Sequence, residues 1–212
     1  MSTQPLRIAA LISGGGRTLI NLHDLIMSGS LPATIELVIA SRREIEGVRR
    51  ALGRGLDVRL APRGDFASET LMHDQITRWL TESRIDLVCL CGYLRWFRID
   101  QAFRGRVINI HPALLPRFGG HGMHGDHVHQ AVLDARCTQS GCTVHFVDAE
   151  YDHGPIILQR RCPVLPDDNV HSLAARVFEE ERLAYAEAIR AIAEGRVTLE
   201  NDSRVAVRVT DS

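Results

Sequence analysis

Hydrophobic positions in the first half of this chain form short apolar runs separated by amphipathic stretches. The apolar runs predict strands at residues 6–12, 34–40, 57–61, 86–91 and 107–110. The amphipathic stretches predict helices at residues 18–28, 44–53 and 68–83. Alternating strands and helices are typical of a parallel sheet covered by helices on both faces. We therefore expect an α/β fold with a doubly wound, mostly parallel open sheet.

The second half departs from strict alternation. It predicts a helix at residues 125–135, strands at 142–147 and 155–162, a long helix at 171–193, and a hairpin within 196–210 around residues 201–203. The linker between the two strands is short, so we expect the C-terminal part of the sheet to be mixed or antiparallel. We expect one domain over residues 1–212, made of two halves that divide at about residue 105.

The composition and charge exclude several classes of protein. The 212 residues are 45% hydrophobic and 24% charged, which is ordinary for a soluble globular chain. A formal net charge of −1 provides no field for nucleic acid or an anionic membrane surface. Apolar runs stay well short of the roughly 20 residues that span a bilayer, and the N-terminus leads into a strand rather than a signal peptide. We expect a cytoplasmic protein without nucleic-acid or membrane partners.

The cysteines predict buried, reduced thiols. There are five, an odd number, and four of them lie in apolar, strand-like stretches. Cys89 and Cys91 alternate along a predicted strand, so their thiols point to opposite faces. This arrangement argues against a redox pair and against a zinc knuckle.

The most informative segment is residues 109–116, Asn-Ile-His-Pro-Ala-Leu-Leu-Pro, which follows an apolar strand. It places the amide of Asn109 and the imidazole of His111 two residues apart at a strand end, where open α/β sheets bind ligands. An amide donor beside a potentially cationic imidazole suits a reaction that develops negative charge on an oxygen.

A glycine-rich turn, residues 13–18, closes the first strand and opens the first helix. Its glycines allow a tight turn, and amides at a helix N-terminus favour phosphate. The turn lacks the glycine spacing of a dinucleotide-binding loop and the Lys-Ser/Thr ending of a P-loop. We favour a monophosphate site; the alternative is a turn without a ligand.

A second polar group surrounds the turn within residues 141–155. It offers four candidates, His145, Asp148, Glu150 and Asp152. A turn aspartate usually caps backbone amides. For Asp152, a functional role needs a partner, and His111 is the obvious one, because a carboxylate raises the tendency of an imidazole to be protonated.

Three segments, 109–116, 141–147 and 152–159, closely resemble the phosphoribosylglycinamide formyltransferases of purine biosynthesis in order and spacing. The turn at 13–18 also falls where that family has its phosphate loop. The resemblance covers roughly residues 6 to 200. The combination of Asn109, His111 and Asp152 resembles the wider folate-dependent formyltransferase superfamily, so it indicates the chemistry better than the substrate.

The resemblance implies formyl transfer from 10-formyltetrahydrofolate, as co-substrate, to the amine of glycinamide ribonucleotide. Asn109 would donate to the developing oxyanion, and protonated His111 would stabilise the same oxygen or assist proton transfer. Asp152 would hold His111 protonated and pass a proton from the amine, through water. The nucleophile belongs to the substrate, so no covalent intermediate is needed, and we expect no metal.

The resemblance also implies binding residues. The phosphate would be cradled by Gly14, Gly15, Gly16, Arg17 and Thr18, the ribonucleotide contacted by Glu181, and the folate lined by Leu94, Arg95, Trp96, Phe97 and Asp148. The first half would thus bind the nucleotide phosphate, and the second would be catalytic and bind folate. Glu181 has the alternative of a solvated helix carboxylate, and Trp96 and Phe97 that of core residues. A homodimer is left open.

Two segments depart from the family pattern. Arg17-Thr18 stands where the family commonly has Ser-Asn; the guanidinium either strengthens phosphate binding or signals a different phosphorylated amine. Residues 119–129 are rich in histidine, and His124 and His127 have a helical ligand spacing that suits zinc or nickel. We favour a flexible loop at the rim of the active site, with His121 as a candidate substrate contact.

Three other functions remain as alternatives. One is formyl transfer to another phosphorylated or sugar-nucleotide amine, and another is hydrolysis of formyltetrahydrofolate. The third is a non-catalytic nucleotide- or metal-binding module, against which the joint presence of Asn109, His111 and Asp152 counts.

Overall fold

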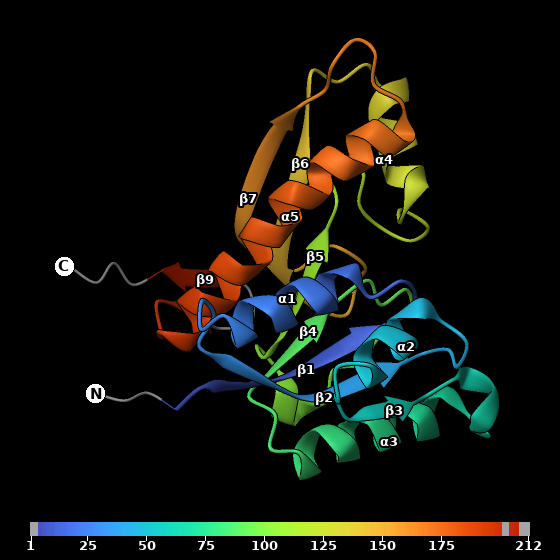
Figure 1. Ribbon diagram of the computed structural model, residues 1–212, viewed down its shortest axis with the longest axis vertical. Helices are drawn as coiled ribbons and strands as arrows, with labels where there is room; N and C mark the ends of the chain where they lie inside the picture. Colours follow the sequence, from blue (N-terminus) through green and yellow to red (C-terminus); the bar gives the residue numbers. More distant parts are fainter. Residues whose placement is uncertain (1–3, 201–203, 208–212) are drawn as a thin grey trace. The chain divides into compact units, whose positions relative to one another are not determined.

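The computed structural model describes residues 4–200 and 204–207, so the first three residues and the predicted turn around residues 201–203 lie outside the described part. The chain divides into two compact units, Met1–Ile108 and Asn109–Ser212 (Figure 1). Each unit is described by itself.

The first unit is built from alternating strands and helices. Its strands are β1 (Leu6–Ile12), β2 (Ala33–Ala40), β3 (Val58–Leu60) and β4 (Leu87–Leu90). Its α-helices are α1 (Arg17–Met27), α2 (Glu46–Leu52) and α3 (Glu69–Glu82), with 3₁₀ turns at Arg63–Asp65 and Gln101–Phe103. The strands run in the order β3-β2-β1-β4 and all pair in parallel.

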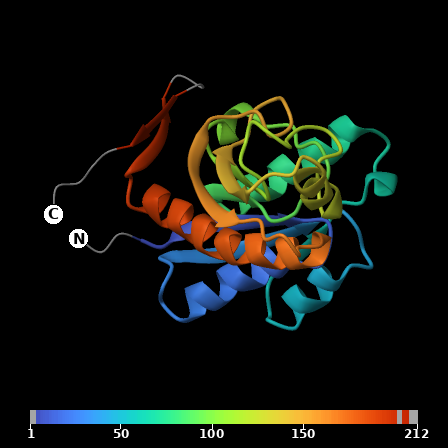
Figure 2. The same cartoon turned by 90° about the horizontal axis from the view of Figure 1, so that it is seen from above.

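This strand order determines which helix covers which face. The chain moves from β1 to β2 to β3 in one direction, and then returns to β4 on the other side of β1. Because parallel crossovers are right-handed, the return places α3 on the face opposite to α1 and α2 (Figure 2). The strands are covered on both sides, and Ile8 to Ile12 of β1 are fully buried.

The strand order reverses between β1 and β4, and their carboxyl ends are joined by hydrogen bonds. The Ser13 N–H donates to the Gly92 carbonyl at 3.1 Å, and the Leu94 N–H donates to the Ser13 hydroxyl oxygen at 3.0 Å. Open α/β sheets bind ligands at such a reversal. The segments after β1 and β4, both predicted to bind substrate, therefore meet there.

The second unit contains the predicted mixed strands. Strand β5 (Val107–His111) begins at the end of the first unit and finishes in the second. Strands β6 (Gln139–Phe146) and β7 (Ile156–Pro163) pair antiparallel, as expected from their short linker. Helix α4 (Asp126–Asp134) packs against α5 (Val170–Ala193), and α5 packs along β6 and β7 (Figure 1).

The fold-class prediction is confirmed, and the tail forms the predicted hairpin in its described residues, β8 (Val197–Glu200) paired with β9 (Arg204–Val207). The longest helix begins where the sequence marks its start: Asn169 and Ser172 form a capping box that satisfies amides of the first turn. Within the described residues, no helix is long and apolar enough to cross a membrane.

Candidate active site

Strand β5 presents Asn109 and His111 on the same face, because side chains two residues apart in a strand point the same way. The strand extends one residue beyond the predicted end, so His111 is its last residue. His111 is 3% exposed, and its imidazole is therefore almost completely removed from water.

The turn between β6 and β7 brings Asp152 to this face. Asp152 has a φ of 53°, in the left-handed region that non-glycine residues seldom adopt. Two residues later, a Cβ at Gly154 would lie 1.9 Å from the Phe146 carbonyl oxygen, so only glycine fits this close approach. The turn thus holds a largely buried carboxylate, 10% exposed, in one orientation.

The Asp152 carboxylate joins the three predicted catalytic side chains. One oxygen, Oδ2, lies 3.3 Å from His111 Nδ1 and accepts the Gly120 N–H at 3.1 Å. The other oxygen, Oδ1, accepts from the Asn109 amide nitrogen at 3.2 Å. The structure therefore brings together Asn109, His111 and Asp152, as the sequence predicts.

His145 completes this cluster, although sequence reasoning counted it only among the polar candidates near the turn. Its Nδ1 donates to the Phe146 carbonyl at 2.8 Å, and its Nε2 lies 3.1 Å from the Asn109 amide nitrogen. A neutral His145 with its proton on Nδ1 accepts from Asn109 through Nε2. The available signal was a histidine between two apolar residues, Val144 and Phe146, in the largely buried strand β6.

Backbone groups of the segment after β5 also belong to the cluster. His111 Nε2 donates to the Phe118 carbonyl at 2.7 Å, on the side of the ring opposite to Asp152. Between Phe118 and Gly120, a Cβ at Gly119 would lie 2.5 Å from the Leu115 side chain and 3.2 Å from Asp152 Cβ. Gly119 therefore permits the close packing that brings the Gly120 N–H to the carboxylate.

Burial and charge act in opposite directions on the two ionisable partners. Burial lowers the pKa of His111 below its usual value, and this outweighs the raising effects of the Asp152 carboxylate and the Phe118 carbonyl. Burial alone would raise the pKa of Asp152, but the proximity of His145 and His111 and the hydrogen bond from the Gly120 N–H bring it below its usual value. The Asp152 carboxylate thus raises the pKa of His111, as expected of such a pair, but burial is the larger effect, and the sequence did not reveal it.

The predicted phosphate loop lies in the first unit, after β1. Gly16 is the N-cap of α1, with a φ of 69°, and no side chain caps the first turn in this described part of the chain. The first turn of α1 carries no acidic residue, and Arg17 is its first residue. Backbone N–H groups at such a terminus suit an anion.

Two residues of α2 support this loop, and the sequence gave no indication of their contacts with it. Gly47 N–H donates to the Gly14 carbonyl at 3.0 Å, and a Cβ on Gly16 would lie 2.8 Å from Gly47 Cα. Arg50 Nη1 donates to the Gly15 carbonyl at 3.0 Å. Gly47 contributes through the close approach of two backbones and Arg50 through one side-chain contact, and sequence spacing carries no signal for either contact.

The predicted folate segment follows β4 in the first unit. Leu94 and Trp96 are 44% and 40% exposed, whereas Phe97 is 4% exposed and packs edge-on against His73 and Tyr93. The burial of Phe97 fits the alternative of a core residue. Leu94 and Trp96 keep surface available for a ligand.

The remaining predicted binding residues lie in the second unit. Asp148 accepts the Glu150 N–H at 2.8 Å, and its other oxygen lies 2.8 Å from His153 Nδ1. Asp148 therefore orders the same turn that carries Asp152. Glu181 lies in α5, and its carboxylate is close enough to help raise the pKa of the Cys142 thiol.

The histidine-rich segment does not form one loop. His127 and His129 lie in α4, and His129 is 5% exposed. The rings of His124 and His127 are 5.7 Å apart, and that of His121 is 5.5 Å from Tyr151. Across residues 4–200 and 204–207, no group of three or more metal-ligating side chains gathers.

The five cysteines are free thiols, and all but Cys137 are buried. Burial raises the pKa of Cys142 to about 12 and also raises the pKa values of Cys91 and Cys162. A thiol that stays protonated is a poor nucleophile. These three cysteines are therefore structural residues at neutral pH.

Comparisons with known proteins identify the family of this chain. The family model described as formyl transferase matches residues 6–189. The chain is 34% identical to the phosphoribosylglycinamide formyltransferase of Haemophilus influenzae, over 92% of this chain and 91% of the relative. It is 36% identical to the chloroplastic phosphoribosylglycinamide formyltransferase of Vigna unguiculata, over 92% of this chain, and spans 64% of the length of that relative.

A solved structure shows the same fold. The crystal structure of glycinamide ribonucleotide transformylase 1 from Symbiobacterium toebii superimposes with a TM-score of 0.88 at 39% identity, over 96% of this chain and 94% of that one. The match covers both units and therefore includes the segments that carry Asn109, His111 and Asp152. The chain belongs to the formyl transferase family, among the phosphoribosylglycinamide formyltransferases.

Proposed function

We propose that this chain transfers the formyl group of 10-formyltetrahydrofolate to the amine of glycinamide ribonucleotide, a step of purine biosynthesis. One observation carries the proposal: in a chain of this family, Asp152 accepts a hydrogen bond from Asn109 and also lies 3.3 Å from His111 Nδ1. An amide, an imidazole and a carboxylate together supply the donor and the proton carriers that formyl transfer needs.

In the proposed reaction, the substrate amine attacks the formyl carbon, and the carbonyl oxygen becomes an oxyanion. A carbon–nitrogen bond to the acceptor forms, and the bond to the folate nitrogen breaks. The Asn109 amide nitrogen carries two hydrogens, which already have acceptors at Asp152 Oδ1 and His145 Nε2. The formyl oxygen therefore replaces one of these two acceptors when Asn109 stabilises the oxyanion.

The pair of His111 and Asp152 handles the proton that the amine loses. A carbonyl only accepts hydrogen bonds, so the contact with Phe118 puts a proton on His111 Nε2. In a neutral ring, Nδ1 then carries a lone pair that faces the ionised carboxylate. We propose that the proton passes through water to Asp152 and is shared with His111 Nδ1, so that positive charge grows beside the oxyanion. The folate nitrogen takes up a proton as it leaves.

Substrate binding is proposed for both units. Gly14, Gly15, Gly16, Arg17 and Thr18 would hold the ribonucleotide phosphate, and Glu181 would contact the ribonucleotide. The folate would be bound by Leu94, Arg95, Trp96 and Asp148, with Phe97 beneath them in the core. The first unit is thus the phosphate-binding half, and the second carries the catalysis.

We also propose a cytoplasmic location, which the five free cysteines favour, and leave a homodimer open.

The test is the release of tetrahydrofolate from 10-formyltetrahydrofolate by the purified chain, with and without glycinamide ribonucleotide. Release that depends on the ribonucleotide is the expected result. Equal release without it would overturn the proposal in favour of a hydrolase. Absence of release in both cases, with release upon addition of another phosphorylated or sugar-nucleotide amine, would assign a different acceptor.

A further inference from the structure

A cavity of about 430 Å³ lies within the second unit. Its walls come from the segment after β5, the end of α4 and the facing ends of β6 and β7. The volume falls in the range of small-molecule sites. Phe118 lines this cavity, and Asn109, His111 and Asp152 do not.

Three arginines gather on the lining, Arg117, Arg136 and Arg161. The lining contains no aspartate or glutamate. Among the described residues, none of the three guanidinium groups forms an ion pair with a carboxylate, whereas many other arginines of the chain do. Arg117 lies 4.9 Å from the centre of the Phe118 ring, which orients its guanidinium. Positive charge is therefore concentrated here without a counter-charge from the described chain.

The three arginines are exposed, so their guanidinium groups are open to a ligand from solvent. Ser140 also lines the cavity, but it pairs with Cys162 whereas Arg161 pairs with Gly141. The side chains of Ser140 and Arg161 therefore point to opposite faces of the strand pair, and the arginines alone provide the polar groups for an anion.

We propose that the cavity binds a small phosphate-bearing anion with two or more negative charges. Guanidinium groups match phosphate oxygens in planar, paired hydrogen bonds. The apolar side chains of Leu114 and Val132 on the same walls accommodate an uncharged part of the ligand. None of the residues that line this cavity belongs to the loop at residues 14–18 that we propose for the substrate phosphate.

The test is titration of the full chain with pyrophosphate. Calorimetry measures the affinity, and the backbone amide signals in NMR locate the site. We expect saturable binding with the largest amide shifts at residues 136–140. Arg136→Asn combined with Arg161→Gln should weaken this binding about tenfold or more, the size expected when charged hydrogen bonds are lost. Asparagine tolerates the left-handed conformation of Arg136, whose φ is 51°, so the variant keeps its backbone.

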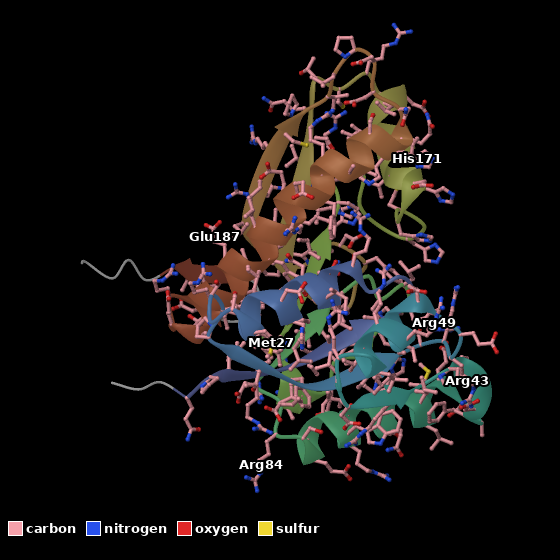
Figure 3. All side chains as sticks on the ribbon, in the orientation of Figure 1. Met27, Arg43, Arg49, Arg84, His171 and Glu187 are labelled. Atoms are coloured by element: carbon pink, nitrogen blue, oxygen red, sulfur yellow. The ribbon has the colours of Figure 1, made fainter. Side chains whose placement is uncertain are left out.

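The chain offers a matched control. Arg84 follows α3 as Arg136 follows α4, with a φ of 49°, and its side chain points into solvent (Figure 3). Arg84→Asn removes the same charge in the same backbone setting and should leave the affinity unchanged. Arg17→Gln tests the other anion site and should leave the shifts at residues 136–140 in place.

Several outcomes would overturn the proposal. These are no saturable binding, shifts confined to residues 14–18, or an equal loss of affinity in Arg84→Asn and in Arg136→Asn. Equal binding of citrate would overturn the phosphate class. Because no readout involves formyl transfer, failure of this proposal and failure of the proposed function are distinguishable.

Discussion

The loop after β1 and the cluster around Asp152 are both proposed to interact with the substrate, but they consist of different chemical groups. The loop offers backbone N–H groups at the start of α1, held by contacts with the backbone of Gly47 and the side chain of Arg50. The cluster consists of buried side chains that satisfy one another through Asp152. The loop depends on shape and the cluster on chemical identity. Substitutions should therefore affect substrate binding in the loop, and turnover in the cluster.

The largest expected effect comes from Asp152→Asn. The variant keeps the size of the side chain but removes the negative charge that faces His111 Nδ1 and the oxygen that accepts from Gly120 or Asn109. Turnover should fall on the order of 10³-fold, as for loss of a preorganised electrostatic group, while the KM for the ribonucleotide stays within a few-fold. Steady-state kinetics with both substrates checks this.

Glu150→Gln is the matched control for this variant. Glu150 lies in the same turn and is exposed, so removal of its charge should leave turnover nearly unchanged. Turnover of Asp152→Asn close to that of Glu150→Gln would remove Asp152 from the mechanism.

The second largest effect is expected from Gly47→Ala, which tests the shape of the loop. A Cβ on Gly47 would lie 2.7 Å from the Gly14 carbonyl oxygen and 2.8 Å from the Ile12 side chain, so the loop must shift. Overpacking of this kind costs about 1–3 kcal/mol of stability. The KM for the ribonucleotide should rise about tenfold or more, which corresponds to about 1.4 kcal/mol or more, with little change in kcat.

Gly64→Ala serves as the control, because a Cβ on Gly64 meets no atom within 4 Å. Kinetics and urea unfolding of both variants separate a local loop shift from general destabilisation. A fall in kcat without a rise in KM in Gly47→Ala would contradict the division of tasks between loop and cluster.

The same division explains what the sequence predicts well and what it does not. Hydrophobic periodicity predicts the strands and helices. The cluster could be predicted because Asn109, His111 and Asp152 carry functional groups that are recognisable from residue type alone. Gly47 and the backbone groups of Phe118 and Gly120 could not be predicted in this way. They contribute backbone atoms, whose contacts depend on where the folded chain places them. Burial is also a property of the folded chain, and it determines the direction of the His111 pKa shift.

A third, smaller effect concerns pH and compares a buried histidine of each unit. Burial lowers the pKa of His73, with Arg98 adding to the shift, and burial also lowers the pKa of His111. The unfolded chain therefore takes up protons first, near pH 6.5, so the free energy of unfolding should fall as the pH drops below that value. The loss is complete once the pH is below the pKa values in the folded state. Urea unfolding between pH 8 and pH 5 measures this.

NMR titration of the two rings sharpens the comparison. In Asp152→Asn the pKa of His111 should fall further, since the carboxylate raises it, while that of His73 stays unchanged. In Arg98→Gln the pKa of His73 should rise, since Arg98 lowers it. A rise of the His111 pKa in Asp152→Asn would show that the carboxylate does not act on this ring as the geometry indicates.

The smallest expected effect is that of Arg50→Gln, which weakens the loop without changing its backbone. Arg50 donates to the Gly15 carbonyl but is 40% exposed and also pairs with Glu46, so solvent screens its contribution. The KM for the ribonucleotide should rise only about two- to fivefold, in keeping with less than about 1 kcal/mol for an exposed charged contact. Arg49→Gln is the matched control, because Arg49 is 78% exposed and also pairs with Glu46. A KM increase shared equally by both variants would mean that general loss of charge, rather than the contact with Gly15, affects the substrate. A difference that persists in high salt would support the contact, since salt screens general attraction more strongly than a short hydrogen bond.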